Sequence, residues 1–208
     1  MNAFTAKAVS VIWHPVFVNL LCLYLLFSFY PPLSFGVPQK LQLFYVGFIF
    51  IATSIIPVFL VLLMKAMGTI SAITMEKQED RKYPYLFTLS LYIFVFYNLS
   101  QSPITPSFLL QYIFACTGIV VAVFLINSFN KISIHLATMG ALCGLIAALA
   151  FKGFADFRLM LALGILASGW VASARLTLQA HLPNQLYLGF LLGFIFMFFI
   201  LNLNFKFA

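Results

Sequence analysis

Long apolar stretches separated by short polar breaks make up almost the whole chain. Residues 83–130 contain no charged side chain, and residues 41–64, 132–151 and 176–205 are further stretches without one. A bilayer span needs roughly 20 consecutive apolar residues, and each of these stretches reaches that length. Only helices or closed barrels satisfy the backbone in lipid, and continuous rather than alternating apolar runs favour helices. The pattern predicts an all-α, polytopic membrane helix bundle of about six to seven transmembrane helices.

Prolines and polar runs divide the chain into seven segments, because proline stops a helix and keeps the preceding residue extended. The third segment is short for a full span and is the one most open to a re-entrant or tilted arrangement. The first is too long for the apolar region of a secretory signal, so we expect a retained span. We expect a single integral-membrane domain over residues 1–208. The predicted segments are residues 8–30, 42–67, 84–100, 107–127, 133–151, 156–175 and 184–205.

Composition removes the soluble alternatives. Hydrophobic residues make up 64% of the 208 residues and charged residues 7%, whereas about a quarter of a soluble domain is charged. The net charge of +7 comes from 11 lysines and arginines scattered over short loops, which is typical of contact with phospholipid head groups rather than with nucleic acid. Cys22, Cys116 and Cys143 lie in separate apolar segments, and we expect no metal site and no cofactor.

The few charged and histidine residues fall mainly on one side of the predicted membrane. If residues 75–82 lie on side one, the alternation of spans brings residues 131–135 and 175–181 to the same side. Charges at a bilayer boundary are costly unless they are solvated or paired, so such a convergence indicates a site. The residues that converge are Lys77, Arg81, Ser133, His135, Arg175 and His181.

The chemistry of these residues suits an anion. Pro183 fits the first turn of the last helix, so His181 lies just before a helix N-terminus, where free amides attract negative charge. Arg175 offers a planar guanidinium for two phosphate oxygens. Lys77 and Arg81 are four residues apart, which on a helix would direct both cations from one face. Two histidines in such a pocket supply the nucleophile and the acid of a metal-free phosphoryl transfer.

The residues on side one form three patches, which we number in chain order: residues 77–84, 132–135 and 174–185. In order and spacing these patches resemble the motifs of the type 2 phosphatidic acid phosphatase superfamily of integral-membrane lipid phosphatases. That family's third motif is S-R-x5-H-x3-D, its second is P-S-G-H and its first is K-x6-R-P. Here the third is matched by Arg175, His181 and Gln185, the second by Ser133 and His135, and the first, in degraded form, by Lys77 and Arg81 before Pro84. The resemblance covers residues 75–205 as a phosphatase-like core, with two helices over residues 8–67 as additions.

The resemblance implies a lipid-phosphate or polyprenyl-pyrophosphate phosphatase that acts through a phosphohistidine intermediate. His181 would accept the phosphoryl group and His135 would protonate the leaving oxygen. It also implies a bacterial inner-membrane protein whose site faces the extracytoplasmic side. The expected partners are membrane lipids and a phosphorylated lipid substrate, with room for a membrane-protein partner or a homo-oligomer. The implied phosphate ligands are Lys77, Arg81, Ser133 and Arg175.

Gln185 keeps a second hypothesis open. In the family the aspartate at this position fixes the tautomer of the nucleophilic histidine and stabilises its positive charge, whereas a glutamine carbonyl accepts the hydrogen bond without supplying charge. In the serine-protease triad a carboxylate-to-amide change lowers turnover about ten-thousandfold. The alternative is therefore a weak or inactive relative that binds or moves phosphorylated lipid, or serves as a subunit of a membrane assembly. A channel or transporter is a third reading, with composition alone behind it.

The remaining polar and glycine positions have structural interpretations. His14, between Trp13 and Pro15, is interpreted as part of an interfacial aromatic anchor at a helix start. Asp156 and Arg158 are expected to solvate a tight turn. Four glycines are expected to let the segments 133–151 and 156–175 approach closely. They are Gly140, Gly144, Gly164 and Gly169.

Overall fold

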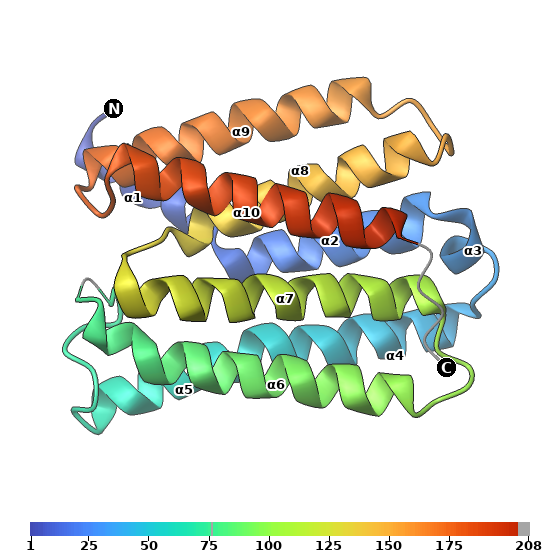
Figure 1. Cartoon of the computed structure of the whole chain (residues 1–208), viewed down its shortest axis with the longest axis horizontal. Helices are drawn as coiled ribbons and strands as arrows, with labels where there is room; N and C mark the ends of the chain where they lie inside the picture. The colour runs from blue at the N-terminus through green and yellow to red at the C-terminus, as the bar shows by residue number, and fades with distance from the viewer. Residues whose placement is uncertain (76, 204–208) are drawn as a thin grey trace.

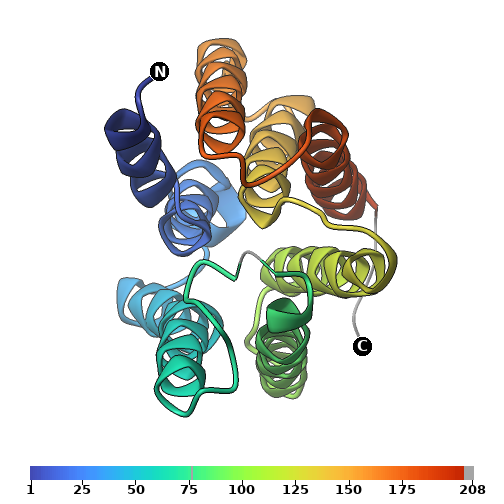
Figure 2. The ribbon, with the colours of Figure 1, turned by 90° about the vertical axis from the view of Figure 1, so that its left-hand side faces the viewer.

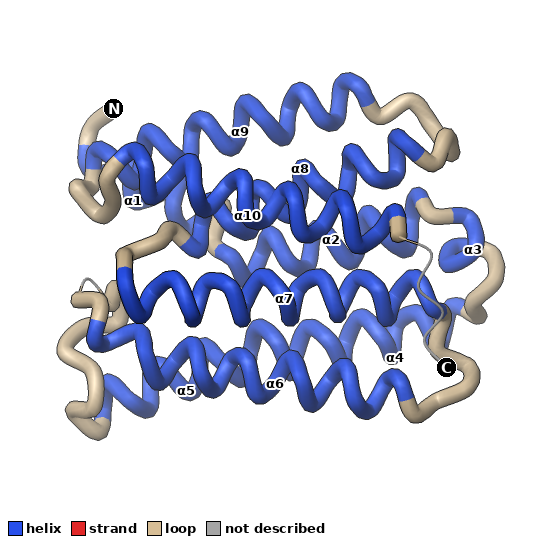
Figure 3. The backbone as a smooth tube through the Cα atoms, in the orientation of Figure 1, coloured by secondary structure: helices blue, strands red, loops and turns tan. Residues whose placement is uncertain are grey.

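The computed structural model describes residues 1–75 and 77–203 and contains only helices and loops over that part of the chain (Figure 3). Residue 76 of the polar run, and residues 204 and 205 of the last predicted span, lie outside the described residues. In chain order the elements are α1 (Ala3–Ile12), α2 (Pro15–Phe29), α3 (Pro31–Ser34), α4 (Gln39–Phe50), the π-helical η1 (Ile51–Ile55), α5 (Ile56–Ala66), the 3₁₀ turn η2 (Glu79–Arg81), α6 (Lys82–Ser100), α7 (Ser107–Phe129), α8 (Ile134–Phe151), α9 (Arg158–Thr177) and α10 (Pro183–Asn202).

The long helices lie side by side as one elongated bundle (Figure 1). Five are long and apolar enough to cross a membrane: the continuous run Gln39–Ala66, α7, α8, α9 and α10. The bent pair of α1 and α2 makes a sixth if it is one span. The predicted all-α membrane bundle is therefore confirmed. The third predicted segment forms α6, a helix of 19 residues packed along α7 and α5, and it is not one of these five candidate spans.

The first predicted span is not the straight helix that its apolar run suggests. The helices α1 and α2 meet at an angle of 41°, because Pro15 lacks an N–H group and its ring clashes with the preceding turn. Pro15 stands at the first position of α2, where proline is well tolerated. His14 caps that helix, and its Nδ1 accepts the backbone N–H of Val16 at 3.4 Å.

The closest helix pair in the bundle is α8 with α10, and its glycines correct the sequence prediction. Gly140 and Gly144 face α10 and not α9. From the other side, a Cβ at Gly193 would lie 1.9 Å from the carbonyl oxygen of Ala137, and one at Gly189 would lie 2.6 Å from that of Ser133. Only glycine permits such backbone approach. Of the four predicted glycines, Gly164 packs against α8, with a Cβ there 3.1 Å from Cys143 Sγ.

A buried polar network ties the N-terminal helices to the rest of the bundle. Asn19 of α2 donates to Thr53 of η1 at 3.0 Å, and the hydroxyl of Tyr112 in α7 donates to Asn19 Oδ1 at 2.7 Å. Polar side chains in an apolar interior are costly unless they pair in this way. The cluster of buried apolar residues likewise runs from Ala6 to Leu201.

Candidate functional site

Three polar segments meet at one end of the bundle, where α1, η2, α8 and α10 all begin. We call it the histidine end and define it by the α1–α2 junction and by residues 77–85, 131–135 and 175–185. Figure 2 looks at this end of the molecule and shows the loops that precede α6, α8 and α10 gathered around it. The glycine contacts between α8 and α10 bring two of these segments together, since the backbone N–H of Ser133 donates to the carbonyl of Gln185 at 3.4 Å.

His181 is held in one tautomer by Gln185. Its Nδ1 lies 3.1 Å from Gln185 Oε1, one turn into α10. The backbone N–H of Leu182 donates to the same Oε1 at 3.2 Å, which requires that atom to be the amide oxygen and not the nitrogen. An oxygen acceptor requires a proton on Nδ1 of the neutral ring. The lone pair of His181 therefore stands on Nε2, the nitrogen that Gln185 does not touch.

The His181 imidazole is neutral at physiological pH. Its side chain is buried, with 8% of its surface exposed, and burial lowers its pKa to about 3, assisted by the positive charges of Arg81 and Arg175 and opposed by the hydrogen bond with Gln185. A neutral imidazole keeps the nucleophilic lone pair on Nε2 available. Gln179, with a left-handed φ of 52°, turns the chain after α9 so that His181 precedes α10.

Arg81 is a buried cation of the first patch, and it contacts the second patch through Ile132. Only 5% of its surface is exposed. Its Nε donates to the carbonyl of Met75 at 2.8 Å, and its Nη1 donates to the carbonyl of Ile132 at 3.3 Å. A guanidinium carries five N–H donors, so these two bonds do not exhaust it. Tyr85, one turn further along, also hydrogen-bonds to Arg81.

Arg175 lies in the last turn of α9, where the negative end of the helix dipole favours a cation. Its Nε is buried and has no hydrogen-bond partner within residues 1–75 and 77–203. Its charge acts on His135, His181 and Arg81. The two guanidiniums therefore stand near each other with no salt bridge to either of them among the described residues, which is costly unless an anion joins them.

The second patch opens α8, as the sequence predicts, but its two residues are used differently. Ser133 is the N-cap of α8, is fully buried, and its Oγ accepts the N–H of Leu136 at 3.4 Å. His135 faces the other histidines: it is hydrogen-bonded to the backbone of Ser10 in α1 and interacts with His181. Ser133 is thus adjacent to the cluster without opening into it.

Lys77 does not join the other predicted residues. It lies in a bend outside any helix and is exposed, so the geometry with Arg81 that a helix would give is absent. The loop carboxylate of Asp80 interacts with Lys77 and Lys65 instead of with Arg81, and a hydrogen bond from Ser71 is the main cause of its lowered pKa. The negative charge of Asp80 is therefore directed away from the buried arginine.

His14 belongs to the cluster, which the sequence reading missed. Its ring meets His135 edge-on, with centroids 5.5 Å apart and planes at 88°. The predicted place of His14 at a helix start is confirmed, because it is the N-cap of α2, and its ring contacts protein within the bundle. The His14-Pro15 pair in the sequence could have indicated this contact. A proline breaks the helix, and the polar residue that caps the new helix must face protein and not lipid.

No group of three histidine, cysteine, aspartate or glutamate side chains among the described residues is placed to hold a metal ion. The structure thus brings together Arg81, His135, Arg175, His181 and Gln185, with His14 added and Ser133 beside them. A neutral imidazole with a free Nε2, two guanidiniums and further imidazoles can bind a phosphate group and attack its phosphorus.

Compared with known proteins, the chain matches no family model, no curated protein and no solved structure.

Proposed function

We propose that the histidine end binds the phosphate of a phosphorylated lipid and transfers it to His181. The protein is then a membrane lipid-phosphate or polyprenyl-pyrophosphate phosphatase. The observation that carries the proposal is the double use of Gln185 Oε1, which accepts from Leu182 and from His181. It leaves the His181 lone pair on Nε2, near two guanidiniums that have no salt bridge within residues 1–75 and 77–203.

The proposed reaction has two steps. The bound phosphate, which is negative, favours the imidazolium form of His135. Nε2 of His181 attacks phosphorus, the bond from phosphorus to the lipid oxygen breaks, and that oxygen takes a proton from the His135 imidazolium, which becomes neutral. Water then attacks phosphorus, neutral His135 takes a proton from the water, and the phosphorus–nitrogen bond breaks, so that phosphate leaves and the His181 lone pair is restored. Arg81 and Arg175 hold the non-bridging oxygens, where charge is greatest during transfer.

Gln185 performs one of the two tasks that a carboxylate performs at this position in the family. It fixes the tautomer, but it supplies no negative charge to the imidazolium that forms when His181 is phosphorylated. The alternative function follows from this difference: a protein that binds or moves phosphorylated lipid, alone or in a membrane assembly, without hydrolysing it.

The test is phosphate release by purified protein from a panel of lipid phosphates and polyprenyl pyrophosphates, in the presence of a metal chelator. Acid-labile, base-stable phosphate on the wild-type chain, absent from His181→Ala, would identify the intermediate. Binding of the lipids without release or phosphohistidine would favour the alternative. Release that survives His181→Ala would overturn both.

We further propose a bacterial inner-membrane location with the histidine end extracytoplasmic. Because α10 begins at the histidine end, its last residue, Asn202, then lies on the cytoplasmic side. A reporter enzyme that works only in the cytoplasm, fused after residue 208, should therefore show activity. A periplasm-specific reporter active at the same position would reverse the orientation.

A further inference from the structure

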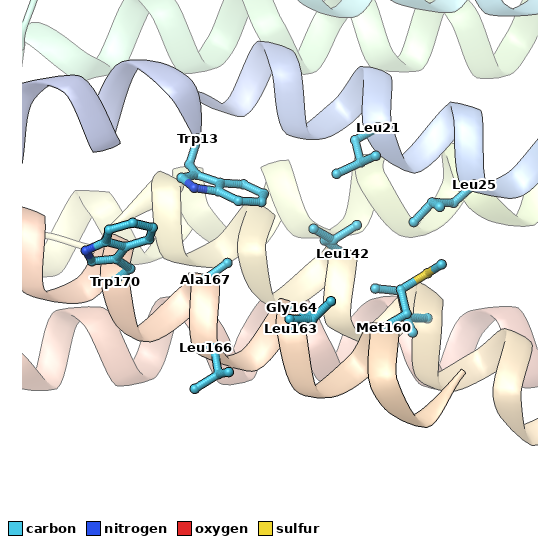
Figure 4. A pocket seen from close by; sticks show the side chains of 11 residues that line it. Trp13, Leu21, Leu25, Leu142, Met160, Leu163, Gly164, Leu166, Ala167 and Trp170 are labelled. Atoms are coloured by element: carbon cyan, nitrogen blue, oxygen red, sulfur yellow. The ribbon is translucent and has the colours of Figure 1, made fainter. Parts of the chain in front are cut away.

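An apolar groove lies between α2, α8 and α9 and begins beside the histidine end (Figure 4). Its volume is about 570 Å³, within the range of ligand pockets. Figure 4 shows Trp13 and Trp170 at one end, Leu25 and Met160 at the other, and Leu142 between them. Along α9 the groove extends over ten residues, or about 15 Å at the rise of an α-helix.

The groove is continuous with the site. Trp13 at its near end is followed in the chain by His14, whose ring contacts His135. On the other wall, Arg175 lies five residues beyond Trp170 on α9, toward the same end of the bundle. The far end of the groove at Met160 lies near the opposite end of α9, two residues after Arg158. A molecule with its phosphate at Arg175 would therefore meet the groove directly.

The lining selects for a hydrocarbon chain. It consists of leucine, isoleucine, methionine, alanine and glycine side chains with two indoles at the mouth. Indoles prefer the boundary between hydrocarbon and head groups, and the phosphate-binding residues lie beyond them. A short soluble phosphate ester has no hydrocarbon to fill such a surface, whereas a lipid chain fills it without exposing apolar surface to water.

We propose that this groove binds the hydrocarbon chain of the phosphorylated lipid whose phosphate is held at the histidine end. The proposal rests on the proposed function and narrows it to substrates with a long apolar chain that enters from the membrane between α2 and α9. Specificity for chain length then resides in residues outside the phosphatase-like motifs, partly on the N-terminal helix α2.

The two tryptophans of the chain both line the groove, so their fluorescence reports its occupant. The probe is a long-chain alkyl phosphate with bromine atoms along its chain, added to the full protein in nanodiscs of unbrominated phospholipid. Its control is the same brominated alcohol without phosphate. We expect half-maximal quenching by the phosphate at a mole fraction about tenfold lower, because charge-assisted hydrogen bonds add to its affinity.

Two variants on α9 test the groove by substitution. Ala167→Phe fills it, whereas Gly169→Phe is the matched control, since Gly169 is exposed and a Cβ there meets no atom within 4 Å. We expect Ala167→Phe to lower the ratio of kcat/KM for a long-chain over a short-chain phosphate ester about tenfold. Gly169→Phe should leave that ratio unchanged.

The outcomes separate this proposal from the proposed function. Equal quenching by phosphate and alcohol, or none by either, overturns the groove even if hydrolysis by His181 is established. Stronger quenching by the alkyl phosphate supports chain binding in the groove even if the protein releases no inorganic phosphate. In that case only the proposed hydrolysis is contradicted. If Ala167→Phe does not fold, quenching in Trp13→Phe and Trp170→Phe decides, because each remaining indole must still respond.

Discussion

The two ends of the bundle both carry arginine, and they treat its charge in opposite ways. At the histidine end, Arg81 is 5% exposed and Arg175 Nε has no partner in the described part of the chain. At the opposite end, the side chain of Arg158 is 91% exposed and pairs with Asp156 at 2.8 Å. That pair is the one salt bridge found within residues 1–75 and 77–203, and hydrogen bonds from Arg158 lower the pKa of Asp156 to about 2.

This difference shows which charges point to function. An exposed pair is solvated and contributes little to stability, and the sequence prediction that Asp156 and Arg158 form a solvated turn agrees with it. A buried cation without a counter-ion destabilises the folded state, so its presence indicates a role other than stability. The histidine end should therefore respond strongly to substitution and to anions, and the opposite end should respond to neither.

The largest effect is expected from His181→Ala. Removal of the proposed nucleophile should lower phosphate release on the order of 10³-fold or more, because it removes the imidazole whose tautomer Gln185 fixes for attack. Asp156→Asn at the opposite end is the control and should keep wild-type activity. Steady-state rates with a lipid phosphate measure both variants. A wild-type rate in His181→Ala would contradict the claim that the histidine end responds more strongly to substitution than the opposite end.

Arg175→Gln should lower kcat/KM about 100-fold, the usual cost of losing one donor to a developing charge. The same substitution should raise the melting temperature, since it removes a partly buried guanidinium that has no salt bridge among the described residues. Arg158→Gln is the matched control and should change neither quantity, because its side chain is solvated. Thermal unfolding and kinetics on the same preparations measure both effects. A lowered melting temperature in Arg175→Gln would assign that arginine to structure.

Gln185→Glu adds the missing charge at the same side-chain length, so the hydrogen bonds to His181 and Leu182 can persist. The carboxylate should raise the pKa of His181 from about 3, and turnover should rise about tenfold because the imidazolium is stabilised. In the wild type, His181 should stay neutral at pH 5. Nitrogen-15 NMR of labelled histidines measures the pKa, with His181→Ala for assignment.

Hydrolysis seen only in Gln185→Glu or Gln185→Asp would establish the wild type as the binding protein of the alternative hypothesis. Loss of activity in both variants would contradict the proposed role of the Gln185 oxygen.

The smallest effect is expected from His14→Ala. An edge-on ring pair contributes about 1 kcal/mol, so loss of the contact with His135 should lower kcat about fivefold. KM should stay constant if His14 positions His135 and does not bind phosphate. Ser10→Ala on the same side of His135 is a useful comparison, because it keeps the backbone that His135 bonds. An unchanged kcat in His14→Ala would return this residue to the role of a helix cap.

The sequence predicts the fold well and the site in part. Apolar runs and prolines locate α7, α8, α9 and α10, and the odd and even order of spans places Arg81, His135, Arg175 and His181 at one end. Lys77 could not be placed, because whether residues four apart share a face depends on a helix that begins only near Glu79. The place of His14 in the cluster was missed because its neighbours in space come from α8, not from its own segment.

The sequence by itself determined that the chain is a helical membrane bundle with scarce charge, because hydrophobic length and charge placement act locally along each helix. Only the tertiary structure decided which cations lose their solvent and which keep it. Burial depends on the close approach of α8 and α10 at Gly189 and Gly193, and on the bend that Pro15 imposes on the first span. The hydrogen bonds that fix the tautomer of His181 are local, because His181, Leu182 and Gln185 lie within five residues. The burial that keeps the His181 ring neutral is decided only by the folded bundle.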